Sequence, residues 1–431
     1  MPRGSADTIV AIATPAGRGG VGVVRVSGPL AGQVCEGICG VLPEARRAMH
    51  RRFLDEDGRV LDEGLVLRFA APASYTGEDV VEFQGHGSPP ALSALVHRCV
   101  ALGARPARPG EFTERAFLND RLDLAQAEAV ADLIDASSER AARAAARSLS
   151  GEFSRTIIGF ESALEDLRVL IEAAIDFPEE DVEVIGRYQV RERLAVLLAR
   201  MDGVLAEASR GQRLREGATV VLIGEPNVGK SSLLNRLAGE ELAIVTPVPG
   251  TTRDPIRAPI TLDGVPLLLV DTAGLRASTD VVEQEGIARS KGHARQADLA
   301  LIVTEAERSI EAVTAQFGAE LPLPARRIVV RNKIDLTSGL GQVRKTGDHV
   351  EVRVSAATGE GLDLLRREIL EAVGWQSGEE ESVFLARTRQ LSALTRAREH
   401  LQAAASLVAV QVDLVAEELR YSREALGEIL G

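Results

Sequence analysis

One stretch of the chain has the spacing of a phosphate-binding loop. Residues 224–231, Gly-Glu-Pro-Asn-Val-Gly-Lys-Ser, match the pattern G-x-x-x-x-G-K-[ST] at every constrained position. Glycines in such a loop let backbone N–H groups face a phosphate, Lys230 can reach the terminal phosphates, and the Ser231 hydroxyl can hold Mg²⁺. The sequence therefore predicts a site for a nucleoside triphosphate.

The flanking residues predict the elements that must position this loop. The apolar run 219–223 predicts a strand before it, and residues 231–237 have the apolar spacing of a helix after it. A strand, a glycine loop and a helix N-terminus in this order disfavour the alternative of a Gly-rich turn that matches by chance.

Two motifs downstream predict the γ-phosphate side of the site. Gly250–Asp254 lies in a Gly/Pro-punctuated loop, where the Thr252 hydroxyl can complete Mg²⁺ coordination while a γ-phosphate is present. Asp271 ends an apolar strand, so its carboxylate can hold Mg²⁺ through water, and the Gly274 N–H three residues later can meet the γ-phosphate.

Two further motifs predict which base is bound. Asp335 closes the run 332–335, Asn-Lys-Ile-Asp, and can accept hydrogen bonds from guanine N1–H and its exocyclic amine, which adenine does not offer. Residues 355–357, Ser-Ala-Ala, follow the next strand and resemble the last guanine-contacting loop. Together the motifs predict a Ras-like GTP-binding domain. Its predicted GTP-binding residues are Asn227, Val228, Gly229, Lys230, Ser231, Ser232, Thr246, Pro247, Val248, Pro249, Gly250, Thr251, Thr252, Asp271, Thr272, Ala273, Gly274, Asn332, Lys333, Asp335, Ser355, Ala356 and Ala357.

The residue that would orient the attacking water is not the usual one. Leu275 stands where Ras-type enzymes place a glutamine, and a leucine cannot orient water. Hydrolysis then needs another acid or base, another cation, or a partner's arginine. Glu283 is a candidate, although from the residues alone a solvated surface carboxylate is the favoured interpretation.

Composition restricts the class of protein. The 431 residues predict two to four domains, and a net charge of −13 argues against a protein that coats nucleic acid non-specifically. The three cysteines, Cys35, Cys39 and Cys99, are too few for a disulfide scaffold, and no His or further Cys nearby favours a metal site. Without an apolar signal core or a spanning apolar run, we expect a soluble cytoplasmic protein with no membrane insertion.

Residues 8–120 predict an α/β domain. Gly17–Gly22 matches the dinucleotide-binding pattern G-x-G-x-x-G, but residues 23–27 predict a strand rather than a helix, so a hairpin-like glycine loop is favoured. Further strands are predicted at 65–69 and 80–83, and a helix at 89–103. The run Gly85-His86-Gly87 predicts a turn, in which His86 packs rather than catalyses.

Helical patterns lie on both sides of the GTP motifs. An almost uninterrupted helix is predicted over 124–149, with Asp123 and Gln126 in a capping arrangement, and further helices over 153–175, 188–210 and 384–430. Residues 375–382 predict a linker. We therefore expect α/β and all-α parts in one multidomain chain, with the GTP domain inserted into a helical domain. The predicted boundaries are 1–120, 121–215, 216–376 and 377–431.

The chain resembles the MnmE (TrmE) family of bacterial tRNA-modification GTPases from Thr8 to nearly its last residue. The blocks that carry this resemblance beyond the GTP motifs are Ala13-Thr14-Pro15, Gly17-Arg18-Gly19-Gly20, Thr76-Gly77-Glu78-Asp79, residues 108–117 (Arg-Pro-Gly-Glu-Phe-Thr-Glu-Arg-Ala-Phe) and residues 124–129 (Leu-Ala-Gln-Ala-Glu-Ala). These blocks do not occur in generic GTPases.

The resemblance implies an architecture and an activity. It implies an N-terminal domain that dimerises and binds a tetrahydrofolate derivative (5,10-methylene or 5-formyl), a helical domain from two chain segments, and an inserted G domain. Family members act with the flavoprotein MnmG, in a heterotetramer or larger complex, to add a carboxymethylaminomethyl or aminomethyl group to C5 of the wobble uridine (position 34) of certain tRNAs. GTP hydrolysis, which drives the conformational cycle, requires K⁺ and pairing of two G domains.

The resemblance also implies roles for individual residues. Asn227, Thr246, Val248 through its carbonyl, and Thr251 would hold K⁺, in place of an arginine finger. Glu283 matches the family's catalytic carboxylate, which orients water. The matches to folate contacts are Arg25, Glu82 and Arg121, where the family often has Lys at position 121; surface or inter-strand charges are the alternative for all three.

The last residues differ from the family pattern. The family usually closes with a segment ending in Cys-Ile-Gly-Lys, whereas this chain stops at Gly431. The resemblance implies either a truncated chain or a protein without the modification function, and GTP hydrolysis is expected in both cases. The alternative function is a regulatory GTPase switch in RNA or ribosome assembly. A folate-binding module with a remnant GTPase is disfavoured by the intact GTP motifs.

Overall fold

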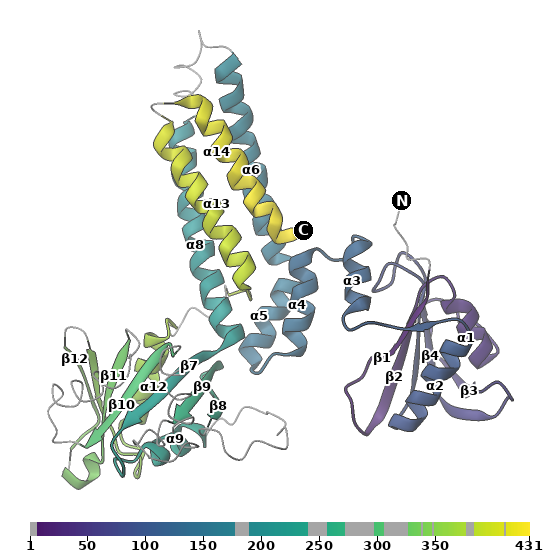
Figure 1. Ribbon diagram of the computed structural model, residues 1–431, viewed down its shortest axis with the longest axis horizontal. Helices are drawn as coiled ribbons and strands as arrows, with labels where there is room; N and C mark the ends of the chain where they lie inside the picture. Colours follow the sequence, from purple (N-terminus) through teal and green to yellow (C-terminus); the bar gives the residue numbers. More distant parts are fainter. Residues whose placement is uncertain are drawn as a thin grey trace, which may run out of the picture. The chain divides into compact units, whose positions relative to one another are not determined.

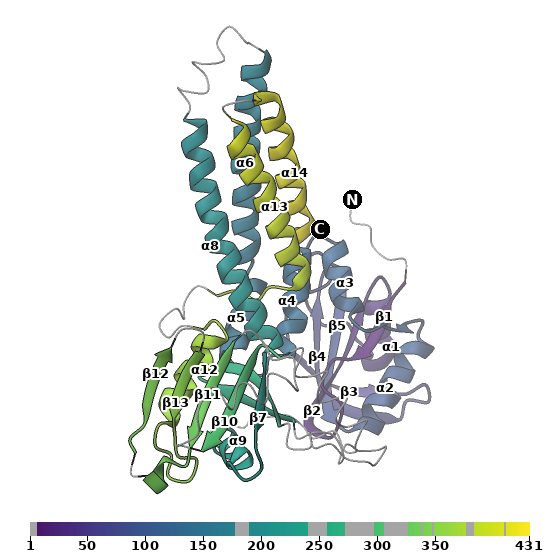
Figure 2. The same cartoon turned by 60° about the vertical axis from the view of Figure 1, so that its left-hand side comes forward.

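The computed structural model describes residues 7–176, 189–239, 257–271, 297–305, 326–337, 339–346, 349–375, 383–408 and 411–431. The chain divides into two compact units, one of residues 1–130 with 430–431 and one of residues 131–429. Figures 1 and 2 show both units from two sides. No helix in the described ranges is long and apolar enough to cross a membrane.

The first unit is built on a six-stranded sheet in the order β3-β4-β5-β2-β1-β6, antiparallel except for the β1–β6 pair. Alternating apolar residues of the strands, such as Val24 and Val26, pack against Val34 and Ile38 of α1 and Leu95 of α2. Its elements are β1 (Ile9–Ile12), β2 (Gly19–Ser27), α1 (Ala31–Cys39), β3 (Met49–Leu54), β4 (Val60–Phe69), β5 (Val80–Gly87), α2 (Pro89–Ala101), β6 (Arg105–Pro106), α3 (Glu111–Leu118) and the start of α4 (Leu124–Ile134).

Two glycine-rich stretches of the first unit lie mostly in strands of its sheet. β1 pairs antiparallel with β2, which confirms that Gly17–Gly22 does not open a dinucleotide-binding helix. The turn predicted at Gly85-His86-Gly87 is wrong, because these residues belong to β5. A Cβ at Gly87 would lie 2.6 Å from the carbonyl oxygen of Gly19, so this glycine permits close approach of β2 and β5.

The helices of the second unit come from two distant stretches of sequence. The predicted helix 124–149 is in fact two helices, because the Ser138 hydroxyl caps a new helix by accepting from the Ala141 N–H at 3.2 Å. The predicted capping pair at the start of α4, in the first unit, is confirmed, with Gln126 N–H donating to Asp123 Oδ1 at 2.8 Å. The helices are α5 (Glu139–Leu149), α6 (Glu152–Asp176), α8 (Val190–Glu216), α13 (Thr388–Leu407) and α14 (Val412–Leu430).

α6, α8, α13 and α14 lie side by side as a bundle (Figures 1 and 2). The Phe153 and Phe384 rings stack with centroids 4.4 Å apart, and Arg423 Nη1 lies 2.9 Å from Glu165 Oε2. Both contacts join residues far apart in the sequence, so one helical body is assembled from two chain segments, as predicted. The region 384–430 is not one helix, because α13 ends at Leu407 and α14 begins at Val412.

Between these helical segments the chain forms a seven-stranded sheet in the order β12-β13-β11-β10-β7-β9-β8. The five central strands are parallel, and the antiparallel edge strands β8 and β12 were not expected from the sequence. Trp375 is 7% exposed in the core of this part, so it does not begin a linker as predicted. The elements are β7 (Ala218–Gly224), α9 (Lys230–Ala238), β8 (Arg257–Leu262), β9 (Val265–Asp271), β10 (Leu299–Glu305), β11 (Arg327–Asn332), the 3₁₀ helix η1 (Ile334–Thr337), β12 (Gln342–Thr346), β13 (His349–Arg353) and α12 (Leu362–Ala372).

The two ends of this inserted part lie next to one another. Arg213 Nη1 donates to the Val373 carbonyl oxygen at 2.9 Å, and Gln212 Nε2 lies 3.1 Å from Thr388 Oγ1. Neighbouring termini are what insertion of one domain into another requires. The four domain boundaries themselves stay a prediction.

Candidate nucleotide-binding site

The phosphate-binding loop joins the buried strand β7 to α9. Gly229 has φ 93° and caps α9, and Asn227 has φ 64°, so the loop turns sharply before the helix begins. A Cβ at Gly224 would lie 2.3 Å from the Val303 carbonyl oxygen, and one at Gly229 would lie 2.3 Å from Asn332 Nδ2. Both glycines of the motif are therefore required by close neighbours within the protein.

The charges at this loop suit an anion. Lys230 Nζ donates to the carbonyl oxygens of Gly224 and Glu225 at 2.9 and 2.8 Å, which holds the ammonium over the loop. Ser231 and Ser232 lie in the first turn of α9, and Ser232 is exposed. A helix N-terminus with an ammonium beside it stabilises bound phosphate.

Asn332 connects the phosphate loop to the base-reading loop. Its side chain is 2% exposed, its Nδ2 donates to the Val228 carbonyl oxygen at 2.8 Å, and its Oδ1 accepts from the Ala356 N–H at 2.9 Å. The amide is thus bonded to protein on both sides, where it fixes the spacing of two loops. The contact of Asn332 with GTP stays a prediction.

Asp335 is exposed, and a hydrogen bond from a buried side chain fixes the orientation of its carboxylate. The buried Ser355 hydroxyl donates to Asp335 Oδ1 at 2.6 Å and accepts from the Thr358 N–H at 3.2 Å. A carboxylate held in this way can accept two charge-assisted hydrogen bonds from guanine. The structure thus brings Asp335 and Ser355 together as the motifs predict.

Glu305 pairs with Lys333, a residue of the predicted site, and was not expected from the sequence. It ends β10, and its Oε1 lies 2.7 Å from Nζ of Lys333, a residue with φ 64°. Its position at the carboxyl end of a central parallel strand was the available signal, because ligands of such sheets bind at this edge.

Part of the predicted site lies outside the described residues. This applies to Thr246–Thr252, Thr272–Gly274, Leu275 and Glu283. The backbone of Asp271 ends β9 opposite Leu222, at the expected strand end. The described half of the site holds the phosphate loop, with Asn227, and the two base-reading loops.

Two of the three predicted folate residues meet in the first unit. Arg25 on β2 and Glu82 on β5 are directly opposite, and Arg25 Nε donates to Glu82 Oε1 at 2.8 Å. The Arg25 guanidinium lies 5.3 and 5.7 Å from the ring centroids of Tyr75 and Phe112. Arg121 is exposed, and its Cγ would lie 3.2 Å from a Cβ at Gly77.

Comparisons with known proteins agree with this architecture. The family description "GTP-binding protein TrmE N-terminus" matches residues 8–121, and "MnmE helical domain" matches residues 124–431. The chain belongs to the MnmE family. A tRNA modification GTPase MnmE from Neisseria meningitidis serogroup A is 52% identical over 98% of this chain and 94% of its own length. One from an Azoarcus species is 53% identical over 99% and 94%. As an MnmE family member, the chain is a GTP hydrolase.

A solved structure of Era from Aquifex aeolicus bound to GDP and aluminium fluoride is 27% identical over 42% of this chain and 66% of that one, with a TM-score of 0.28. This score is low, so membership in the MnmE family rests on the sequence relatives.

The MnmE-type blocks at 76–79 and 108–117 are joined by a buried ion-pair network. Arg115 Nη1 lies 3.0 Å from Glu78 Oε2, and Ser27 Oγ donates to the same oxygen at 2.7 Å. Arg115 Nη2 also bonds Glu111 Oε1 at 3.2 Å. Hydrogen bonds from Arg105 lower the pKa of Glu111 to about 2. These blocks therefore fix α3 on the sheet, a role that their spacing alone did not reveal.

Proposed function

We propose that this chain is a K⁺-dependent GTPase that acts with the flavoprotein MnmG to modify tRNA. The modification would be a carboxymethylaminomethyl or aminomethyl group on C5 of the wobble uridine of certain tRNAs. The observation that carries the proposal is the pair of Asp335 and Ser355 beside the loop that holds Lys230. This arrangement supports recognition of GTP, and the curated relatives are named tRNA modification GTPases.

The donor atoms at the loop fit the cations that the family uses. Ser231, with Thr252, offers hydroxyl oxygens of the kind that Mg²⁺ prefers. The exposed Asn227 sits within the loop, and its amide oxygen, with Thr246, Val248 and Thr251, would hold K⁺. A cation there neutralises charge that develops on the phosphates, and Glu283 would orient the attacking water.

The pair of Arg25 and Glu82 is the proposed folate site. Tyr75 and Phe112 flank the guanidinium, so apolar ring surface, a cation and a carboxylate meet at one place. A flat heterocycle with N–H donors fits such a set. The same ion pair also joins β2 and β5. The affinity of a variant for a tetrahydrofolate derivative must therefore be compared with its free energy of unfolding. Arg121 would add a further cation, and the first unit would also form the homodimer.

The modification is tested in bacteria whose only MnmE-type gene encodes this chain. Mass spectrometry of tRNA nucleosides is expected to show the modified wobble uridine, and to lose it in Glu82→Gln if folate binds there. Modified tRNA missing while GTP hydrolysis persists would favour the alternative, a regulatory GTPase switch.

The cation requirement is tested by GTP turnover in matched K⁺ and Na⁺ buffers. We expect faster turnover in K⁺, loss of that preference in Asn227→Ala, and collapse of turnover in Glu283→Ala. Asn235→Ala is the control, since Asn235 is exposed on the neighbouring helix α9. Equal rates in the two salts would overturn the K⁺ assignment.

A further inference from the structure

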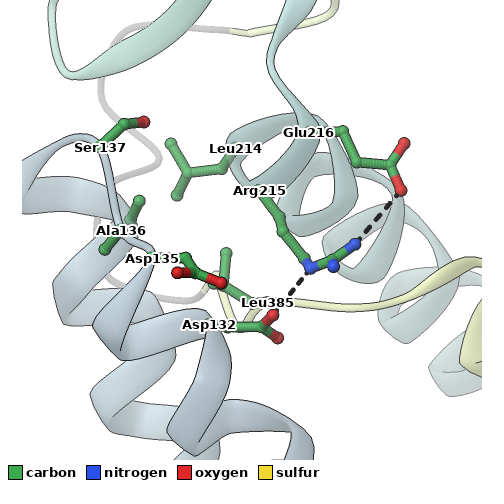
Figure 3. Close-up of a pocket in the computed structure, with 9 residues that line it drawn as sticks. Asp132, Asp135, Ala136, Ser137, Leu214, Arg215, Glu216 and Leu385 are labelled. Atoms are coloured by element: carbon green, nitrogen blue, oxygen red, sulfur yellow. Dashed lines mark hydrogen bonds and ion pairs between the residues drawn. The ribbon is translucent and has the colours of Figure 1, made fainter. Parts of the chain in front are cut away.

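A buried carboxylate lies at the base of the GTP-binding part. Asp132, near the end of α4, is 7% exposed and accepts from two arginines, of which Figure 3 shows Arg215. Arg215 Nε lies 2.8 Å from Asp132 Oδ1, and Arg387 Nη2 lies 2.8 Å from the same oxygen. A buried carboxylate between two guanidinium groups is held far more firmly than an exposed ion pair.

The two arginines flank the inserted part on both sides. Arg215 stands one residue before the end of α8, and β7, which leads to the phosphate loop, begins three residues later at Ala218. Arg387 caps α13, the first helix after the inserted part. Between α8 and β7, Gly217 has φ 73°, and a Cβ there would lie 3.1 Å from the Pro266 carbonyl oxygen. Asp132 therefore joins the incoming and the outgoing chain at one point.

The segment after Asp132 makes a second contact with the GTP-binding part. The Ser138 hydroxyl donates to the Gly264 carbonyl oxygen at 2.6 Å, in the turn between β8 and β9. β9 carries Asp271 at its far end. Asp132 in α4 and Ser138 before α5 thus contact the end of α8, which leads into β7, and the β8–β9 hairpin. These are the two chain paths that lead to the phosphate side of the site.

A cavity of about 180 Å³ lies against this ion-pair group. Asp135, Ala136, Ser137, Leu214 and Arg215 line it together with Asp132 (Figure 3). One side of Arg215 is therefore not enclosed by packed apolar side chains. The guanidinium has room to change its position without displacing core residues, which a tightly packed ion pair would not allow.

We propose that Asp132 is a positioning residue that transmits the nucleotide state of the GTP site to the helical bundle. Through Arg215 it fixes the end of α8, which leads into β7, and through Arg387 it fixes the start of α13. A displacement of β7 on nucleotide exchange then moves both arginines and the helices that carry them. The proposal rests on GTP binding by this chain, and it does not depend on folate, tRNA or a flavoprotein partner.

The test compares hydrogen exchange of the full chain with GDP and with a non-hydrolysable GTP analogue. In the wild type we expect the analogue to change exchange at the end of α8 and the start of α13. Asp132→Asn keeps the size of the side chain but removes its charge. We expect it to reduce that nucleotide-linked difference about fivefold or more, while the Kd for GDP stays within about twofold of wild type.

Asp202→Asn is the matched control, because Asp202 pairs with Arg398 between the same two helices α8 and α13 at an exposed position. It is expected to keep the wild-type difference. If Asp132→Asn does not fold, Arg387→Lys decides, since it retains the positive charge and loses the planar geometry. The proposal is overturned if the folded variant keeps the wild-type difference in hydrogen exchange, or if Asp202→Asn loses that difference to the same extent. It is also overturned if the wild type shows no difference between GDP and the analogue. Absent tRNA modification would count only against the proposed function, because no tRNA is present in this test.

Discussion

The side-chain nitrogen of Asn332 donates to the Val228 carbonyl oxygen at 2.8 Å, so the strand that leads to the base site is bonded to the phosphate loop. The amide oxygen accepts from Ala356 N–H at 2.9 Å on the other side. Because this side chain is almost fully buried, neither bond is readily replaced by water. The distance between the phosphate and base halves of the site is therefore set within the protein, which lowers the ordering cost of nucleotide binding.

Asn332→Ala is expected to weaken GDP and GTP binding roughly 10- to 100-fold. The substitution leaves the Val228 carbonyl and the Ala356 N–H buried without this partner, and each such group costs about 1–3 kcal/mol. Titration with a fluorescent GDP derivative measures the effect. Asn235→Ala, at an exposed position of α9, should bind as the wild type does. An unchanged Kd for Asn332→Ala would mean that the loops keep their spacing without this amide.

Asp335→Asn is expected to reduce the preference for guanine. An amide presents an N–H₂ donor where the carboxylate accepted from guanine, so GTP should lose roughly 100-fold in affinity and xanthosine triphosphate should gain. Competition binding with GTP and xanthosine triphosphate measures the change in base preference. Ser355→Ala, which removes the hydroxyl 2.6 Å from Asp335 Oδ1, should weaken GTP binding about fivefold without favouring xanthine. If Asp335→Asn still prefers GTP, the base is read by another residue.

Glu111 should make the first unit sensitive to acid. Hydrogen bonds from Arg105 lower its pKa from 4.5 to about 2, and its side chain is 3% exposed. A lowered folded-state pKa stabilises the fold above pH 4.5, and this contribution disappears as the pH falls toward 2. Glu111→Gln is therefore expected to cost roughly 3 kcal/mol at about pH 7 and much less near pH 2. Chemical unfolding at a series of pH values checks this, and an equal cost at both ends of the range would contradict it.

The sequence predicted the elements whose patterns are local and strong. The P-loop with its preceding strand and following helix, and the Asp123–Gln126 cap, follow from short-range spacing, which the fold preserves. The two-segment helical body followed from equal patterns on both sides of the GTP motifs. Edge strands β8 and β12 were missed because an edge strand is covered by a neighbour on one side only and its sequence pattern is correspondingly weak.

Other features depend on contacts between distant residues and had no signal in the local sequence. Gly85–Gly87 has the composition of a turn, yet the approach of β2 makes it a strand. The break at Ser138 interrupts a long run of helix formers, and although serine is a common N-cap, the contact of Ser138 is with Gly264, 126 residues away in the sequence. The bond between Asn332 and Val228 joins residues 104 positions apart, so the motif could place Asn332 in the site but could not give its role.

Two glycines of α8 should respond in opposite ways to substitution by alanine. Gly211 is buried where the outgoing chain crosses α8, and a Cβ there would lie 1.9 Å from the Phe384 carbonyl oxygen, so the backbone of one segment must move. Gly203 is exposed eight residues earlier in the same helix, and a Cβ there would meet no neighbouring atom within 4 Å. Gly211→Ala should cost about 1–3 kcal/mol or more, whereas Gly203→Ala should add up to about 1 kcal/mol through helix propensity.

Urea unfolding of the two variants, followed by far-ultraviolet circular dichroism, measures the change in the free energy of unfolding for each substitution. Both substitutions replace a glycine of α8 by alanine and add one methyl group. The difference between their effects on the free energy of unfolding therefore reports the approach of the segment 383–387 to α8. That approach closes the two ends of the inserted part and places Arg387 against Asp132. Equal and favourable effects of both substitutions would show that α8 and the outgoing chain are not in contact in solution, and the helical body would then not be held together at this point.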